Sequence, residues 1–197
     1  MTIVFASSNA HKIKEINAIV PKGITVLGLA DIGITAEIPE TSNTIKENSM
    51  LKARFVFDYL KQQQKTMPVF ADDSGLEVDA LNGEPGVFSA RYAGTPKNDA
   101  NNNQKLLQAL KNVSKRNARF VTVITLLMDK KEQVFEGEVK GTIAYEARGT
   151  NGFGYDPLFI PQSYRSTFAQ LSAETKNSIS HRALAMQQLL AFLKTID

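Results

Sequence analysis

The sequence contains no cysteine and only two histidines among its 197 residues. Without cysteine the chain cannot form a disulfide, a zinc–thiolate site, an iron–sulfur cluster or a cysteine nucleophile. No stretch approaches the roughly 18 consecutive apolar residues of a membrane-spanning helix. Residues 1–6 lack a basic leader and a long apolar segment, so they predict a first strand rather than a signal peptide. We therefore expect a cytoplasmic protein with no membrane partner.

Neither sign of charge is in large excess, since the chain has 23 basic and 20 acidic residues. A net charge of +3 spread along the chain suits an anionic small-molecule substrate, but it provides no basic stripe for nucleic acid. The densest basic stretch, residues 111–119, is expected to be a solvated helix end and loop. With 43% hydrophobic and 22% charged residues, the composition predicts one soluble domain over residues 1–197.

Apolar periodicity predicts an α/β fold in which helices and strands alternate early and strands cluster late. Such an order favours a mixed sheet flanked by helices. The long helix 44–63 opens with a capping box, Thr44 to Glu47, and its many apolar residues predict that it is well buried. Strands are expected near 3–6, 25–29, 67–71, 118–128, 133–140 and 158–160, and further helices over 12–20, from 98 or 99, and from 178 or 180.

Two carboxylates, Asp72 and Asp73, end the apolar run that begins at Met67. Ligands of open α/β sheets bind beyond the carboxyl ends of strands, and adjacent acids there suit a divalent metal. Ser74 and Gly75 would leave room for a ligand. The alternative is a turn, because Asp-Asp-Ser-Gly is also common turn chemistry. If the strand instead continues through both acids, their side chains point to opposite faces.

The first strand-to-helix turn, residues 7–12, is a candidate phosphate site. Ser8 or Asn9 is a good N-cap, small residues at Ser7, Ser8 and Ala10 allow a phosphate to approach the backbone, and Lys12 could neutralise it. An ordinary capped helix is the alternative. Glu40, in a polar loop, matters only if the fold brings it near the two acids, and Lys52 is either a snorkelling side chain or a phosphate contact.

Two later segments could bind a flat ring. Residues 149–157 contain Phe153 and Tyr155 around Gly154, followed by Asp156, which could accept from ring N–H groups. Alternatively, this segment is a hairpin or bulge loop whose aromatic side chains pack into the core. Lys176, His181 and Arg182 form a donor-rich segment near the start of the last helix. The alternative is that the histidine is only a helix cap or a surface residue. Together these parts suit a nucleoside triphosphate.

The chain resembles the inosine triphosphate pyrophosphatase family, the Ham1-like or RdgB-like enzymes that hydrolyse non-canonical purine nucleoside triphosphates. The resemblance covers nearly the whole chain, in order, through the motifs SNAHK (8–12), ENSMLKAR (47–54), ADDSGL (71–76), PGVFSARY (85–92), GFGYDP (152–157) and SHR (180–182). It implies an elongated mixed sheet with two lobes around a central substrate cleft. It also implies Mg²⁺-dependent hydrolysis of ITP, dITP and XTP to the monophosphate and pyrophosphate, usually by a homodimer.

By matching motifs, Asp73 is the implied catalytic proton acceptor, and Glu40 and Asp73 are the implied Mg²⁺ ligands. The implied substrate-binding residues are Ser7, Ser8, Asn9, Ala10, His11, Lys12, Lys52, Ser74, Phe153, Gly154, Tyr155, Asp156, Lys176, His181 and Arg182. A carboxylate bound directly to a metal is a poor base, so Asp73 is not expected to do both jobs in one geometry, and Asp72 is expected to support it. Alternatives are a pyrophosphatase for other modified nucleotides and a non-catalytic nucleotide-binding regulator.

Overall fold

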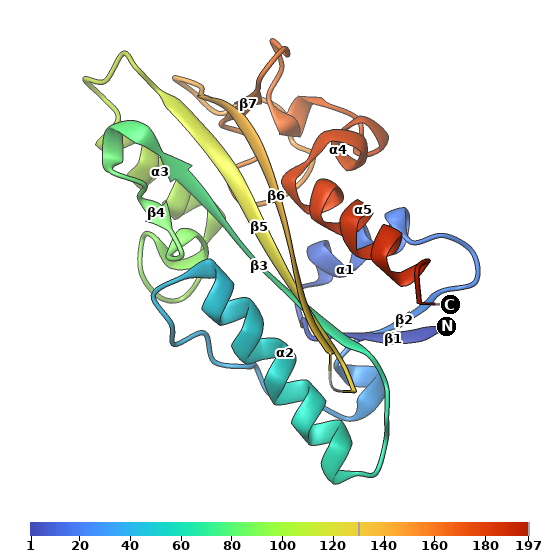
Figure 1. The fold of residues 1–197 in the computed structure, drawn as a ribbon. Helices are drawn as coiled ribbons and strands as arrows, with labels where there is room; N and C mark the ends of the chain where they lie inside the picture. The colour runs from blue at the N-terminus through green and yellow to red at the C-terminus, as the bar shows by residue number, and fades with distance from the viewer. Residues whose placement is uncertain (130, 197) are drawn as a thin grey trace. The chain divides into compact units, whose positions relative to one another are not determined.

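The computed structural model describes residues 1–129 and 131–196, and over these it contains five α-helices and seven strands (Figure 1). The helices are α1 (Ala10–Ile19), α2 (Ile45–Gln62), α3 (Asp99–Ala109), α4 (Ala173–Ile179) and α5 (His181–Leu193). The strands are β1 (Thr2–Phe5), β2 (Thr25–Leu27), β3 (Val69–Val78), β4 (Pro85–Gly86), β5 (Asn117–Met128), β6 (Lys131–Ile143) and β7 (Phe159–Pro161).

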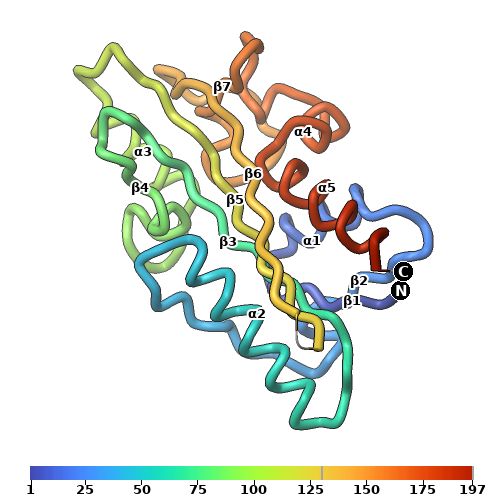
Figure 2. Tube along the Cα trace, in the orientation of Figure 1, coloured from blue at the N-terminus to red at the C-terminus, as the bar shows by residue number. Residues whose placement is uncertain are grey.

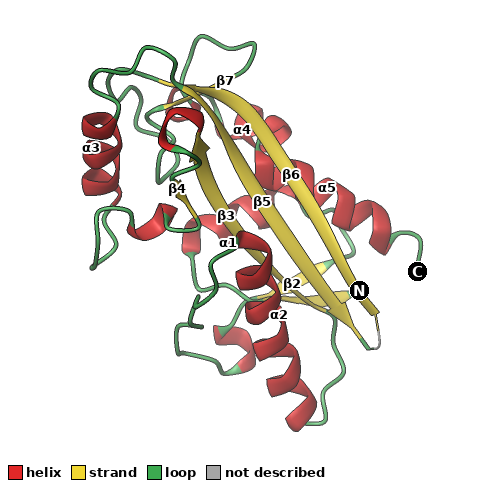
Figure 3. Ribbon diagram, turned by 60° about the vertical axis from the view of Figure 1, so that its left-hand side comes forward, coloured by secondary structure: helices red, strands yellow, loops and turns green. Residues whose placement is uncertain are grey.

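The strands form a mixed sheet, as the sequence predicts. Their order is β2-β1-β3-β5-β6-β7, with β4 paired to β3. β1 runs parallel to both β2 and β3, whereas β4 is antiparallel to β3 and β7 is antiparallel to β6. Figure 3 shows β5 and β6 as the two long neighbouring strands.

The chain divides into two compact units. Unit 1 comprises residues 1–73, 122–137 and 183–197, and unit 2 comprises residues 74–121 and 138–182. In the trace of Figure 2 the chain leaves unit 1 within β3, returns within β5, leaves again within β6 and returns within α5. The prediction of a single domain over the whole chain stays a prediction.

Unit 1 has a separate apolar core on each face of its strands, because neighbouring strand residues point to opposite faces. Ile3, Phe5 and Phe70 belong to the core that α1 and α5 cover, and the rings of Phe5 and Phe70 stack with centroids 4.7 Å apart. Val4 and Ala71, the neighbours of these residues, belong to the core that α2 covers (Figure 1). Residues that follow Ala71 along β3 therefore also point alternately to the two faces.

Unit 2 is built around an aromatic core that includes Phe120, Phe159 and Phe168. Beside it, the guanidinium of Arg116 is buried and donates to the carbonyl oxygens of Leu110, Ile143 and Ala144. These bonds satisfy a cation that would otherwise be costly to bury. The prediction that residues 111–119 are a solvated end and loop is therefore wrong for Arg116.

The most consequential difference from the sequence prediction lies in β3. The strand does not end at the two acids but continues through Asp72 and Asp73 to Val78, so the turn alternative is also wrong. At the C-terminal end, α4 was not expected as a separate helix. The helix α2 is buried along part of its surface only, since Leu51 and Phe55 remain exposed.

The helix caps follow the sequence closely. Asn9 caps α1, Thr44 accepts from the backbone N–H of Glu47 at the start of α2, and Asn98 caps α3. These are local hydrogen bonds between residues two or three apart, which is why composition and spacing could predict them. Among the described residues, no helix is both long enough and apolar enough to cross a bilayer.

Candidate active site

The two acids of β3 each face a lysine from a different helix. Lys12, on α1, donates to Oδ1 of Asp72 at 2.9 Å, and the carboxylate of Asp72 is fully buried. Lys52, on α2, donates to Oδ1 of Asp73 at 3.5 Å and to Oε1 of Glu40 at 2.6 Å. All five residues belong to unit 1, and we call them the carboxylate–lysine cluster.

The strand alternation explains this division. Phe70 packs in the α1 and α5 core and Ala71 in the α2 core, so Asp72 continues toward α1 and Asp73 toward α2. The predicted opposite directions of the two carboxylates are confirmed. Glu40 and Asp73 share Lys52, so the fold does bring the polar loop close to the acidic strand, which is the condition on which the interest of Glu40 depended.

Asp73 carries a polar atom without a hydrogen bond. Its Oδ2 is buried, and no hydrogen-bond partner reaches it from residues 1–129 or 131–196. Burial raises the pKa of the Asp73 carboxyl above its ordinary value, although the nearby Lys52 and Lys12 oppose that rise. For Lys52, burial lowers the pKa, but the charges of Asp73, Asp72 and Glu40 outweigh burial and raise it overall. The cluster thus keeps Lys52 charged beside a carboxylate that holds a proton more readily than an exposed one.

The residues fit a divalent cation that takes part of its coordination from a substrate. Carboxylate oxygens are suitable hard ligands, and Mg²⁺ is commonly held by one or two carboxylates together with phosphate oxygens. The unbonded Oδ2 of Asp73 could bind such an ion or, in another geometry, accept a proton from water, but it could not do both at once. Within the described part of the chain, however, no group of three or more His, Cys, Asp or Glu side chains is arranged to hold a metal.

The predicted phosphate turn is exposed, with a defined cap. Oδ1 of Asn9 accepts from the backbone N–H groups of His11 and Lys12, at 3.0 and 3.2 Å. Residues 8–11 are exposed to solvent, while Lys12 reaches inward to Asp72. Because Asn9 takes two of the N-terminal amides, the cationic side chain of Lys12 matters more here than the bare helix terminus.

In unit 2, cations and aromatic rings gather around Phe153. Lys176 lies 5.0 Å and Arg182 5.8 Å from the centre of the Phe153 ring. Arg182 is almost fully buried and also donates to Oγ of Ser74 at 3.1 Å. We call Phe120, Phe153, Phe168, Lys176, His181 and Arg182 the aromatic–cation cluster.

Asp156 connects Lys176 to the loop that carries Phe153. Its Oδ2 accepts from Nζ of Lys176 at 2.5 Å and from the backbone N–H of Phe153 at 2.8 Å. The sequence suggested that Asp156 accepts from ring N–H groups of a ligand, but this oxygen is used inside the protein. Tyr155, which was a stacking candidate, is buried and donates its hydroxyl proton to the carbonyl oxygen of Ser89 at 2.9 Å.

Sequence reasoning missed two residues of α3 that fix the loop. Asp99 accepts from the backbone N–H of Gly154 at 2.6 Å, and Asn103 donates to the carbonyl oxygen of the same glycine at 2.9 Å. Both polar groups of Gly154 are thus bound by one helix. The partners lie about fifty residues apart in the chain, so no local pattern could have indicated these bonds.

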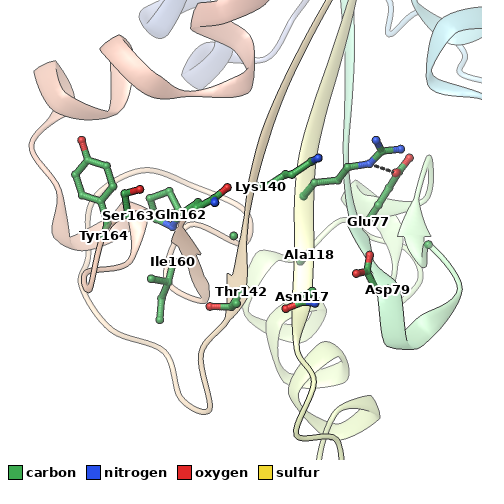
Figure 4. A pocket seen from close by; sticks show the side chains of 14 residues that line it. Glu77, Asp79, Asn117, Ala118, Lys140, Thr142, Ile160, Gln162, Ser163 and Tyr164 are labelled. Carbon is green, nitrogen blue, oxygen red and sulfur yellow. Dashed lines mark hydrogen bonds and ion pairs between the residues drawn. The ribbon is translucent and has the colours of Figure 1, made fainter.

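A separate hollow of about 770 Å³ lies in unit 2, along β5, β6 and β7 (Figure 4). Its charged groups include Arg119, which forms ion pairs with Glu77 and Glu138, both at 2.7 Å. No member of the carboxylate–lysine or aromatic–cation cluster lines this hollow. It therefore does not contain the chemistry that the sequence motifs indicate.

Comparison with known proteins agrees with the sequence resemblance. A family model described as the Ham1 family matches residues 3–192. A dITP/XTP pyrophosphatase of Flavobacterium johnsoniae is 52% identical over 193 residues, which cover 98% of each chain. The Porphyromonas gingivalis protein of the same description is 50% identical and covers 97% of this chain and 96% of its own.

Solved structures show the same similarity at the level of the fold. The Ham1 protein of Staphylococcus aureus has a TM-score of 0.88 and 44% identity, with 100% of both chains covered. A nucleoside-triphosphatase described as a dITP/XTP pyrophosphatase from Mycobacterium abscessus has a TM-score of 0.76 and 39% identity, covering 96% of this chain and 99% of its own.

Proposed function

The chain belongs to the Ham1 family, and from this premise we propose that it hydrolyses dITP, ITP and XTP to the monophosphate and pyrophosphate. The names of its relatives support the substrate class. The observation that carries the chemistry is Asp73, a buried carboxylate with one oxygen facing Lys52 and the other without a hydrogen-bond partner among the described residues.

In the proposed reaction a water molecule attacks the α-phosphorus, and the bond from that phosphorus to the oxygen bridging it to the β-phosphorus breaks. The electron pair of this bond leaves with pyrophosphate. Oδ2 of Asp73 accepts the proton that the water loses, which its raised pKa favours. Lys52 holds the other oxygen of Asp73 and so fixes the direction of the carboxylate.

Positive charge near the triphosphate comes from Lys12 and Lys52. Asp72 anchors Lys12 in an ion pair whose carboxylate is fully buried, so the ammonium group lies inward of the exposed residues 8–11 of the turn. Glu40 would hold Mg²⁺ together with substrate oxygens, and Asp73 would join it as a ligand only in a geometry other than the one in which it accepts the proton; when bound, the ion would neutralise charge on the phosphates and on the departing pyrophosphate. Ser7, Ser8, Asn9, Ala10 and His11 would supply backbone and side-chain contacts to the phosphates.

Base recognition is proposed for the aromatic–cation cluster. The Phe153 ring offers a surface on which a purine can stack, and Lys176, His181 and Arg182 are donors. Hypoxanthine and xanthine carry a carbonyl oxygen at position 6, whereas adenine carries an amino group there. Hydrogen-bond donors therefore favour hypoxanthine and xanthine over adenine, and a site that relies on such bonds can discriminate between substrates by a factor of about 10⁴.

The test is pyrophosphate release from ITP, dITP, XTP, GTP, ATP and dUTP, with and without Mg²⁺. Hydrolysis in ¹⁸O-labelled water should place the label in the monophosphate. Release from dUTP but not from ITP would support a pyrophosphatase for other nucleotides instead. Tight binding of ITP without turnover would support a non-catalytic regulator. Label in the pyrophosphate instead of the monophosphate would contradict attack at the α-phosphorus.

The proposal includes a homodimer acting on the cytoplasmic nucleotide pool, with no nucleic-acid or membrane partner. Light scattering after size-exclusion chromatography would give the mass in solution directly. A mass near the 21.7 kDa of one chain would contradict the dimer.

A further inference from the structure

The imidazole of His181 lies flat against a phenyl ring that no motif of the sequence indicated. His181 and Phe120 stack with ring centroids 4.6 Å apart and planes only 8° from parallel. Both side chains are buried, Phe120 on β5 and His181 at the first position of α5. The two residues belong to unit 2.

Phe120 is itself held in place by other rings. The ring of Phe159 lies 4.7 Å away at a steep angle, and that of Phe168 lies 6.1 Å away in a more parallel arrangement. Phe168 also lies under Lys176, with the ammonium nitrogen 5.7 Å from its ring centre. One group of packed aromatic rings therefore contacts two of the residues proposed to bind the base, His181 and Lys176.

The plane of an imidazole decides where its N–H groups can point. The final torsion of a histidine side chain is broad, so the ring can turn unless a neighbour restricts it. A phenyl ring stacked in parallel allows the imidazole to slide but opposes its rotation out of the plane. The stack therefore selects a narrow range of donor directions for His181.

We propose that Phe120 is a positioning residue for base selectivity: by stacking on His181 it fixes the plane in which the imidazole meets the purine edge. This inference rests on the proposed function, because it takes the aromatic–cation cluster as the base site. Phe120 acts through His181 and takes no part in the hydrolysis itself. Its loss should therefore weaken selection of the base while leaving the chemical step largely intact.

The experiment compares Phe120→Leu with Phe159→Leu. Phe159 is fully buried in the same aromatic group and its ring contacts Phe120 and Phe168, so its variant removes an equal side chain without removing the stack on His181. Phe120→Leu is expected to raise the KM for ITP and to lower the ratio of kcat/KM for ITP over ATP by about 3- to 10-fold, with kcat for ITP nearly unchanged. Phe120→Tyr should restore both values, and Phe159→Leu should change the ratio by less than about twofold.

A second readout does not depend on turnover. The chain has only two histidines, His11 and His181, so the imidazole C–H signals can be assigned by NMR with a His11→Gln variant. Stacking on Phe120 should displace the His181 signals by a ring current. That displacement should disappear in Phe120→Leu and persist in Phe159→Leu and Phe120→Tyr.

The two experiments separate failure of the inference from failure of the proposed function. Unchanged His181 signals in folded Phe120→Leu, or equal loss of selectivity in Phe120→Leu and Phe159→Leu, would overturn the role of Phe120. If the wild-type protein released no pyrophosphate from ITP, the proposed activity would fail. In that case a shift of the His181 signals by inosine monophosphate in the wild type, lost in Phe120→Leu, would still support the positioning role.

Discussion

In unit 1 each buried carboxylate of β3 faces a lysine from a different helix, whereas in unit 2 buried cations lie against aromatic rings. Lys12 and Lys52 offset the charges of Asp72 and Asp73 by direct ion pairs. Lys176 combines an ion pair to Asp156 with the faces of Phe153 and Phe168. Opposite charges suit a site that must bind phosphates and move a proton, and flat rings suit a site that must recognise a purine.

This difference predicts that substitutions in the two clusters affect different kinetic parameters. Changes in the carboxylate–lysine cluster should act mainly on turnover and on the cost of burying charge, because its carboxylates and ammonium groups are charged and mostly buried. Changes in the aromatic–cation cluster should act mainly on KM and selectivity, because the rings shape a binding surface. The four predictions below test this division, from the largest effect to the smallest.

Asp73→Asn should lower kcat for ITP by about 10³-fold or more, because an amide cannot accept the proton from water. The KM should change little. Steady-state pyrophosphate release measures both values, and circular dichroism checks that the fold is retained. Asp72→Asn provides the comparison on the opposite face of β3 and should lower kcat far less. Equal losses for the two variants would contradict the separate roles of the two acids.

Lys12→Met should lower kcat/KM by about 10²-fold through the loss of a fixed positive charge. It also removes one partner of the fully buried carboxylate of Asp72, so the free energy of unfolding should fall by about 1–3 kcal/mol. Urea denaturation measures that fall. The double variant Lys12→Met/Asp72→Asn should recover much of the stability but not the activity. Recovery of activity as well would indicate that Lys12 matters only as the partner of Asp72.

Gly152→Ala should raise the KM for ITP by about tenfold with little change in kcat. A Cβ at this position would overlap the carboxylate of Asp156, and the backbone φ of +77° is unfavourable for alanine. Gly94→Ala is a matched control, since Gly94 also has a positive φ, +106°, but has nothing within 4 Å of the added carbon. An equal KM for the two variants would show that backbone strain alone, rather than displacement of Asp156, is responsible.

Asp73→Asn should also raise the unfolding temperature of the metal-free protein at neutral pH, by roughly 2–4 °C for each kcal/mol gained. The reason is that the folded state raises the pKa of Asp73 above its ordinary value of 3.8, so ionising this group destabilises the fold. The difference between variant and wild type should shrink as the pH falls through the raised pKa and vanish below 3.8, where the carboxyl is protonated in both states. Scanning calorimetry across pH measures it, and a less stable variant at neutral pH would contradict the sign.

Local features of the fold were predictable because the interactions behind them join residues close in the chain. Asn9, Thr44 and Asn98 cap their helices through hydrogen bonds to backbone groups two or three residues away. The mixed sheet followed from the order of apolar runs. By contrast, the sequence did not predict that β3 continues past Asp73 to Val78, because Ser74 and Gly75 are common turn residues and only their pairing within the sheet makes them part of a strand.

The sequence by itself determined the chemical groups at hand: no thiol, two adjacent acids after an apolar run, a lysine after a capped turn, and an aromatic loop with donors. It also carried the family resemblance, which the comparison over residues 3–192 confirms. The tertiary structure decided which groups meet. Lys12 and Asp72 lie 60 residues apart, Phe120 and His181 lie on separate elements, and Arg116 is buried where a solvated residue was expected. Such contacts depend on how strands pair and which faces helices cover, and a local pattern in the chain does not contain that information.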